Sequence, residues 1–170
     1  ALVKQIFLII ISFFFYLLIK EITNTLNIFY KHTDIVLTFI FMITVFSYFY
    51  NKLQLSFISY ILFLVVFLLG REKTERNINF YFYLIEWLSI INKNKIVFIN
   101  IIGNFVLFMP MVIYLNNKYY LLTIVWIIIT FELLQLVTRR GVFDIVDITL
   151  NIIGVVLASI LKRRIYERQR

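Results

Sequence analysis

The residues best suited to chemistry lie close together in one segment, 131–154, which is FELLQLVTRRGVFDIVDITLNIIG. They are carboxylates, side-chain amides and guanidinium groups. Carboxylates can transfer protons or hold Mg²⁺, and arginines bind phosphates and carboxylates through paired hydrogen bonds. The members are Glu132, Gln135, Arg139, Arg140, Asp144, Asp147 and Asn151. Acid–base chemistry, ion binding and the binding of an anionic group are therefore the functions to weigh.

The spacing of these residues predicts polar faces on helices. An α-helix turns by about 100° per residue, so residues three, four and seven apart share one face. Three faces follow: Glu132, Gln135 and Arg139; Asp144, Asp147 and Asn151; and Asn100, Gly103 and Asn104. With short connections, the Arg139, Asp144 and Asn100 ends meet on the same side. That side also receives Arg76 and Asn79 from the preceding link, so we expect one polar cluster.

Each residue also has a plainer interpretation. Asp144 could cap the following helix, with Asp147 adding the acidic residue typical of a first turn. Gln135, Asn104 and Asn151 could be hydrogen-bonding contacts between helices. Arg139 and Arg140 could be ordinary loop charges. Gly103 and Gly154 fit close helix packing and Pro110 fits a kink. These roles would not require all the residues to converge on one side.

Composition sets the environment of these helices. The chain of 170 residues is 62% hydrophobic and 15% charged, and its mean hydropathy is +0.94. Soluble domains are nearer 45–50% apolar and about 25% charged. The sequence therefore predicts an integral membrane protein, an all-α polytopic helical bundle. At the centre of a bilayer a charged group costs about 2.5–3.5 kcal/mol, so Glu132 should face protein, with Arg139 or a neighbouring helix as its partner.

The apolar runs predict about six spanning helices, since each needs about 20 residues. They are 2–19, 35–50, 53–70, 96–115, 119–138 and 145–161. The run 35–50 is short, and whether it spans is open. The link 71–95 contains FYFYLIEWLSI, which is too short to span, so we expect an interfacial or re-entrant segment around 80–91.

The charges favour a membrane and not a nucleic acid as the partner. The net charge is +8, but Lys and Arg flank apolar runs, and a basic tail follows the last one. The two sides of the membrane carry nearly equal numbers of Lys and Arg. Setting aside Arg76, Arg139 and Arg140 as site residues favours cytoplasmic termini and an outward-facing cluster. The absence of cysteine excludes thiolate chemistry, and with one histidine we expect no metal site and no cofactor.

At these residues the sequence resembles the VanZ-like family of bacterial membrane proteins, which is named for an accessory factor in teicoplanin resistance. The matching pieces are RNIN (76–79), NIIGNFVLFMP (100–110), FELLQ (131–135) and RRGVFDIVDITLNIIG (139–154). The resemblance covers about 57–160. It divides the chain into two N-terminal helices outside the match (1–52), a VanZ-like membrane domain (53–162) and a basic tail (163–170). The chain departs from the family at Phe82-Tyr83, Val112 and Val146, where a proline-phenylalanine pair, a glycine and an acidic residue are common.

The resemblance implies a multi-pass protein of the bacterial cytoplasmic membrane that acts in the cell envelope, and it supplies no reaction. Our leading hypothesis is a binding protein that contributes to teicoplanin-type tolerance. Its ligand would be an amphiphile, such as a lipid-linked wall precursor or a lipoglycopeptide, held among membrane lipids. The expected ligand-binding residues are Arg76, Asn79, Asn104, Glu132, Gln135, Arg139, Arg140, Asp144, Asp147 and Asn151.

Three alternatives stay open. A membrane enzyme could use Glu132, Asp144 or Asp147 as acid or base, but no nucleophile motif accompanies them. A small transporter or transporter subunit could route ions or protons past Glu132 and Asp147. A structural membrane partner could use the polar residues as contacts between helices. The sequence does not decide the ligand or the oligomeric state.

Overall fold

The apolar runs form α-helices in a computed structural model that describes residues 2–75 and 77–168. The predicted all-α class is confirmed, apart from two strands of two residues each. The chain divides into two compact units, 1–73 and 74–170, and each is described by itself.

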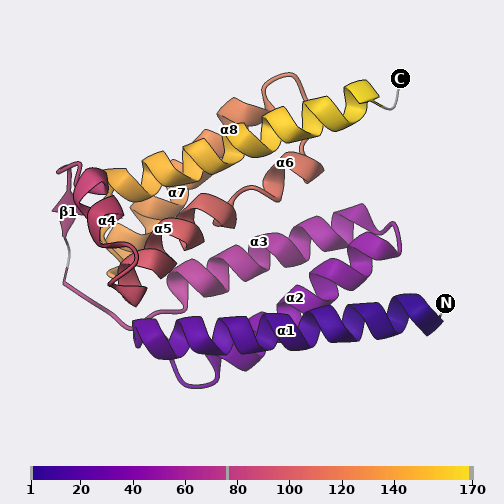
Figure 1. The fold of residues 1–170 in the computed structure, drawn as a ribbon, viewed down its shortest axis with the longest axis horizontal. Coiled ribbons are helices and arrows are strands. Elements are labelled where there is room, and N and C mark those ends of the chain that lie inside the picture. The colour runs from indigo at the N-terminus through magenta and orange to yellow at the C-terminus, as the bar shows by residue number, and fades with distance from the viewer. Residues whose placement is uncertain (1, 76, 169–170) are drawn as a thin grey trace. The chain divides into compact units, whose positions relative to one another are not determined.

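The first unit contains α1 (Leu2–Leu26), α2 (Thr33–Phe49) and α3 (Leu53–Leu69) (Figure 1). The hydroxyl of Ser56 on α3 donates to the carbonyl of Thr44 on α2, at 2.8 Å, and both residues are buried. The rings of Phe15 on α1 and Phe41 on α2 stack with their centroids 3.6 Å apart. Polar groups inside this apolar unit are thus bonded to backbone, as burial requires.

The second unit begins with β1 (Ile78–Asn79) and α4 (Leu84–Ile90). It continues with α5 (Lys95–Leu107), α6 (Met111–Tyr114), α7 (Tyr120–Thr138), β2 (Phe143–Asp144) and α8 (Ile145–Arg168). β1 and β2 pair in parallel, with Ile78 opposite Phe143 and Asn79 opposite Asp144. The sequence did not predict this pairing.

Helices α5 and α8 lie side by side in the second unit (Figure 1). Val97 and Ile101 of α5 share a buried cluster with Val146 and Leu150 of α8. Further along, a Cβ placed on Gly154 would lie 1.8 Å from the carbonyl oxygen of Phe105, so only glycine permits this approach. The close-packing role expected for Gly154 is confirmed. Gly103 differs, because nothing lies within 4 Å of a Cβ placed there.

The predicted kink at Pro110 is a break between two helices. α5 ends at Leu107, a turn covers 108–110, and α6 begins at Met111. Proline lacks the N–H that would continue the α-helical ladder. Beyond the break, the ammonium of Lys162 on α8 donates to the carbonyl of Val112, at 2.6 Å, and to the side-chain oxygen of Asn116, at 2.5 Å. Lys162, predicted as part of a basic membrane flank, therefore also holds the end of α6.

Four helical segments in the described residues are long and apolar enough to cross a membrane. They are Val3–Leu26, Lys95–Tyr114, Tyr120–Thr138 and Ile145–Ile165. Helices α2 and α3 are apolar but have 17 residues each, about 26 Å against a hydrocarbon core of about 30 Å. The expected count of six spans is therefore not confirmed, whereas a membrane protein with several apolar helices is.

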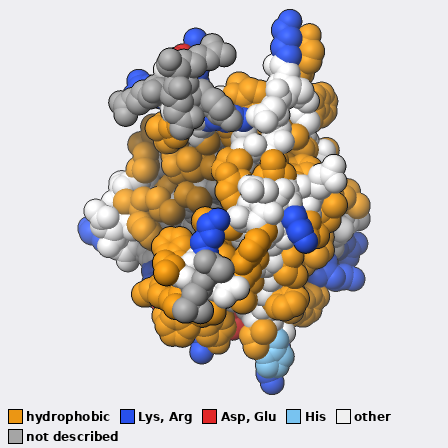
Figure 2. Space-filling model, turned by 90° about the vertical axis from the view of Figure 1, so that its right-hand side faces the viewer, with side chains coloured by type: hydrophobic (Ala, Val, Ile, Leu, Met, Phe, Trp, Pro, Cys, Tyr) orange, Lys and Arg blue, Asp and Glu red, His pale blue; other side chains and the backbone are white. Residues whose placement is uncertain are grey.

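The surface suits a lipid environment. Hydrophobic side chains cover much of the face shown in Figure 2, and Lys and Arg greatly outnumber Asp and Glu on it. Large exposed apolar side chains occur in the middle of the long helices, for example Phe14 on α1 and Trp126 on α7. Exposing so much apolar surface to water would be unfavourable, whereas in a bilayer the same side chains contact lipid acyl chains.

Candidate functional site

The candidate site lies at the end of the second unit where α7 finishes and α8 begins. α7 ends with Arg139 in the left-handed conformation, φ 58° and ψ 36°. The backbone N–H of Arg140 then donates to the carbonyl of Gln135 at 2.9 Å, which closes the last turn. A Cβ placed on Gly141 would lie 3.0 Å from the Gln135 side chain, so a glycine lets the turn pass close to α7. The chain is thereby turned back within five residues.

Two of the three residues on the predicted polar face of α7 are buried. Glu132 is 5% exposed and Gln135 is 4% exposed. A carboxylate oxygen of Glu132 accepts the backbone N–H of Asp144, a long contact of 3.4 Å. This contact is with the main chain of β2, whereas the sequence had predicted Arg139 or a neighbouring helix as the partner. Glu132 lies about 9 Å from the end of α7, at 1.5 Å per residue.

The carboxylate of Asp144 accepts hydrogen bonds from three other described residues. One carboxylate oxygen, Oδ1, accepts the N–H of Val146 at 2.8 Å, which is an N-cap contact for α8. The other, Oδ2, accepts the side-chain amide of Asn79 at 3.3 Å and the hydroxyl of Tyr83. The capping role is confirmed, and the same carboxylate also holds the link that precedes α4. Val146, which replaces the acidic residue common in the family, is a buried apolar residue.

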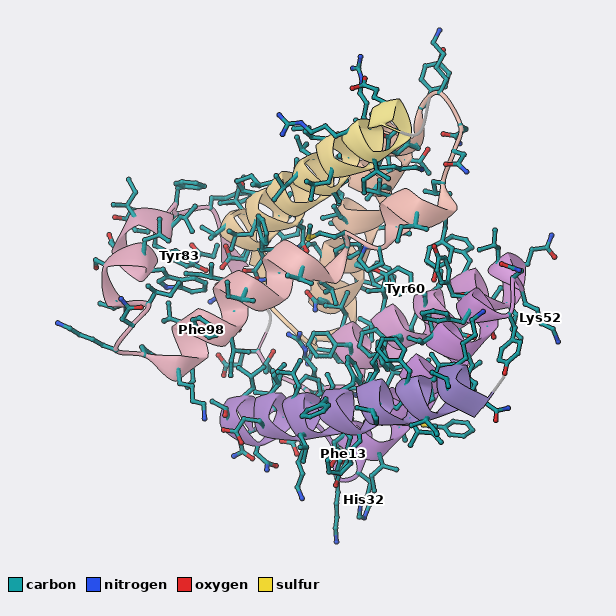
Figure 3. The ribbon with its side chains drawn as sticks, turned by 45° about the vertical axis from the view of Figure 1, so that its right-hand side comes forward. Phe13, His32, Lys52, Tyr60, Tyr83 and Phe98 are labelled. Atoms are coloured by element: carbon teal, nitrogen blue, oxygen red, sulfur yellow. The ribbon has the colours of Figure 1, made fainter. Side chains whose placement is uncertain are left out.

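Tyr83 is the site residue that the sequence missed. Tyr83 directly precedes α4 and is half-buried (Figure 3). Its ring packs on the ring of Trp87, with the two centroids 4.5 Å apart. Burial first, then the hydrogen bond to Asp144 and the charge of that group, raises the pKa of Tyr83 well above the ordinary tyrosine value. Its hydroxyl therefore stays a donor at neutral pH. The only sequence signal was the departure at Phe82-Tyr83, which had been noted without a role.

Main-chain hydrogen bonds fasten the link to the α7–α8 turn. The N–H of Thr74 donates to the carbonyl of Arg139 at 2.7 Å, and the N–H of Phe143 donates to the carbonyl of Asn77 at 3.1 Å. Asn79 turns the chain away again, because its side-chain oxygen accepts the N–H of Tyr81 at 3.0 Å. The convergence of the link with the α7–α8 turn, predicted from the polar faces, is therefore present in the second unit.

The remaining predicted residues lie at varied depths. Arg139 is exposed and Arg140 is half-buried. Asp147 is half-buried, and its carbonyl accepts the amide of Asn151 at 2.8 Å. Asn151 is buried, and within the described residues its side-chain oxygen has no hydrogen-bond partner.

The described hydrogen bonds join three of the ten predicted residues, Asn79, Glu132 and Asp144, into one group. Asn104 is half-buried on α5, and no hydrogen bond joins it to Asp144 or Glu132 among the described residues. Arg76 lies outside the residues that the structure describes. The group that the described contacts join is Asn79, Tyr83, Glu132 and Asp144, which we call the polar cluster.

The polar cluster orders the backbone where α7 ends and α8 begins. Within the described residues no group of three or more His, Asp or Glu side chains is placed to hold a metal ion. The Asp144 carboxylate accepts three hydrogen bonds and so fixes the start of α8, Asn79 and Tyr83 together. The arginines of the adjoining turn are the groups that could meet an anion at the membrane boundary.

Comparison with models of known protein families gives a match over nearly the whole chain. The family model described as VanZ/LLP1 matches residues 3–166. The match begins upstream of the pieces quoted from the sequence, so it includes α1 and α2, which had been placed outside the resemblance. No curated protein and no solved structure matches the chain.

Proposed function

The chain belongs to the VanZ/LLP1 family, and from that premise we propose that it is an envelope protein of the bacterial cytoplasmic membrane that binds an amphiphilic, anionic ligand. The ligand class is a lipid-linked wall precursor or a lipoglycopeptide, and the consequence is tolerance of teicoplanin-type antibiotics. Binding takes place at the α7–α8 turn, on the outer side of the membrane, with both termini cytoplasmic.

The observation that carries this proposal is the construction of the turn beside Arg139 and Arg140. Asp144, Glu132 and the Thr74 main chain fix the backbone on either side of the two arginines. Binding an anion costs less conformational entropy when the turn is already ordered than when binding must order a flexible loop. The turn also lies where a spanning helix ends, which is the depth of a lipid phosphate.

The two arginines supply the charge that such a ligand requires. A guanidinium presents paired donors that match phosphate and carboxylate oxygens, and its hydrogen bonds to an anion are about twice as strong as neutral ones. The carboxylates of Asp144 and Glu132 accept hydrogen bonds from the chain itself. We therefore assign Arg139 and Arg140 to ligand contact, and Asp144 and Glu132 to positioning.

The test is antibiotic tolerance in cells that carry the protein or its variants at matched membrane levels. We expect the wild-type chain to raise the inhibitory concentration of teicoplanin, and Arg140→Ala and Asp144→Asn to remove most of the increase. Arg164→Ala is the matched control, because Arg164 is an exposed arginine in the C-terminal turns of α8. Unchanged tolerance and unchanged lipid binding in both Arg140→Ala and Asp144→Asn would end the proposal.

A structural membrane partner is the second candidate. It is supported by the hydrogen bonds through which the Asp144 carboxylate joins Asn79 and Tyr83 to the start of α8. If the protein is a structural partner, Asp144→Asn lowers its folding stability, whereas Arg140→Ala leaves antibiotic tolerance unchanged. The two variants in the experiment above therefore separate the candidates.

A further inference from the structure

The helix α4 has one face that is fixed inside the second unit. Its inward side chains pack against the buried cluster of α5 and α8, which is Val97, Ile101, Val146 and Leu150. The inward set is Tyr83, Leu84, Trp87 and Ile91. Since this cluster is formed by the first turns of α5 and α8, α4 lies at the end of two spanning segments (Figure 1).

A second face of α4 is apolar and exposed. Ile85 is 76% exposed and Leu88 is 52% exposed, and at about 100° per residue they lie about 60° apart on the helix. Phe80 and Phe82, also exposed, immediately precede the helix. These four residues, which we call the aromatic-aliphatic stripe, have no packing role in the buried cluster of this unit.

A third face carries polar groups next to the stripe. Glu86 and Ser89 are exposed, and Glu86 accepts the hydroxyl of Tyr81 at 2.8 Å. An apolar sector beside a polar sector is the pattern of a helix that lies in the plane of a membrane surface, with its apolar side in the boundary between headgroups and acyl chains. A helix surrounded by water, or one at the bilayer centre, would not need both an apolar and a polar sector.

The two ends of the segment hold it at the membrane boundary. Before α4, Asn79 and Tyr83 are bonded to Asp144. After α4, Lys93 and Lys95 are exposed, and the side chain of Asn94 caps α5 by accepting the N–H of Ile96 at 3.0 Å. The seven residues of α4 span about 10 Å, which is far short of the hydrocarbon core. A deep excursion would place the Glu86 carboxylate in hydrocarbon.

We propose that residues 80–90, which contain α4, form an in-plane membrane segment that contacts the lipid surface around α5, α7 and α8. The stripe of Phe80, Phe82, Ile85 and Leu88 inserts at the level of the lipid carbonyls, while Glu86 and Ser89 face water. The sequence predicted either an interfacial or a re-entrant segment here, and the proposed arrangement is the interfacial one. The inference concerns a membrane contact and is independent of ligand binding at the arginines.

The absence of cysteine from the chain allows a direct depth measurement. Ile85→Cys, Leu88→Cys and Glu86→Cys are each labelled with a bimane fluorophore in vesicles of phosphatidylcholine and phosphatidylglycerol. Quenching is then measured with a lipid nitroxide near the headgroup, with a lipid nitroxide deep in the acyl chain and with aqueous iodide. All three residues are exposed, so the packed face is unchanged. Trp126→Cys, an exposed position further inside α7, calibrates the deep level.

The expected result is a contrast between adjacent residues. Labels at 85 and 88 are quenched more by the shallow lipid nitroxide than by the deep one and are shielded from iodide, whereas the label at 86 is quenched mainly by iodide. Deep quenching at 85 equal to that at 126 would overturn the proposal in favour of a re-entrant segment. Equal iodide quenching at 85, 86 and 88 would also overturn it, since the segment would then lie in water.

Discussion

Asp144 joins three parts of the second unit through one carboxylate. One oxygen, Oδ1, caps α8 by accepting the N–H of Val146, and the other, Oδ2, accepts hydrogen bonds from Asn79 and Tyr83. Hydrogen bonds to a charged group contribute about 1.5–3 kcal/mol each, and an N-cap about 1 kcal/mol. The negative charge also favours the N-terminal end of the α8 dipole. Asp144 is therefore the residue whose charge holds the link in place.

Replacing Asp144 by Asn separates capping from charge. Asparagine caps as well as aspartate does, so α8 should begin at the same residue. The bonds to Tyr83 and Asn79 should weaken, and we expect faster amide hydrogen exchange at 77–84 with little change at 146–150. Glu75→Gln, an exposed change in the same link, is the control. Equal protection of 77–84 in Asp144→Asn and the wild type would contradict the assigned role.

Tyr83→Phe removes only the hydroxyl and keeps the ring on Trp87. We expect a loss of about 1.5–3 kcal/mol in the free energy of unfolding, because the hydroxyl donates to a carboxylate. Tyr81→Phe is the matched control, since that exposed hydroxyl also donates to a carboxylate, of Glu86. Denaturation in detergent micelles compares the two, and an equal effect of both changes would contradict the account.

The contribution of Tyr83 should also depend on pH. Its pKa in the folded protein is raised above the ordinary value of 10.0. A raised pKa means that the folded state keeps the proton more tightly, so the contribution is complete below about pH 10 and is lost as pH rises through the folded pKa. The difference in unfolding free energy between wild type and Tyr83→Phe should be constant from pH 7 to 9 and should fall above pH 10. A difference that falls between pH 7 and 9 would contradict this.

One glycine, Gly154, permits the close approach of α5 and α8 at Phe105. The carbonyl of Phe105 occupies the space that a side chain at 154 would need. Both helices supply the buried cluster against which α4 packs, so their separation would also release α4. The glycine thus connects the packing of two helices of spanning length to the position of the candidate site.

Two glycine-to-alanine changes should therefore differ in sign. Gly154→Ala should destabilise the second unit by about 1–3 kcal/mol or more, because the helices must move apart. Gly103→Ala has open space around the new Cβ, and it should stabilise α5 by about 0.4–1 kcal/mol. Thermal unfolding in detergent measures both, and a stable Gly154→Ala variant would show that α5 and α8 do not approach as described.

Local features of these elements were predictable from sequence, and non-local ones were not. The cap at Asp144, the break at Pro110 and the buried face of Glu132 and Gln135 follow from neighbours along the chain. The β1–β2 pair involves two residues on each side, too few for a periodic pattern, and it joins segments 65 residues apart. Tyr83 was missed because its partner lies in that distant segment. Gly103 and Gly154 are alike in sequence context and differ only in what packs beside them.

The whole chain is a helical membrane protein of the VanZ/LLP1 family, with four helical segments of spanning length in its described part. The count of spans depends on α2 and α3, which begin and end within two residues of the predicted runs 35–50 and 53–70 but have only 17 residues each. Elsewhere the helices extend beyond the apolar runs. α1 continues to Leu26, beyond the predicted end at 19, and α8 continues to Arg168 through the basic tail. The termini are expected in the cytoplasm and the polar cluster outside, an orientation that follows from charge once the site arginines are set aside.

The central claim is that the turn at Arg139 and Arg140 binds the anionic head of an amphiphile, and direct binding tests it. Purified protein in micelles is titrated with a polyprenyl phosphate and with the uncharged polyprenol of the same length. The account predicts that the wild type binds the phosphate at least about tenfold more tightly than the alcohol, about 1.4 kcal/mol. Arg140→Ala should remove most of this difference, while Arg164→Ala should retain it. Equal affinity of the wild-type protein for both lipids would contradict the claim.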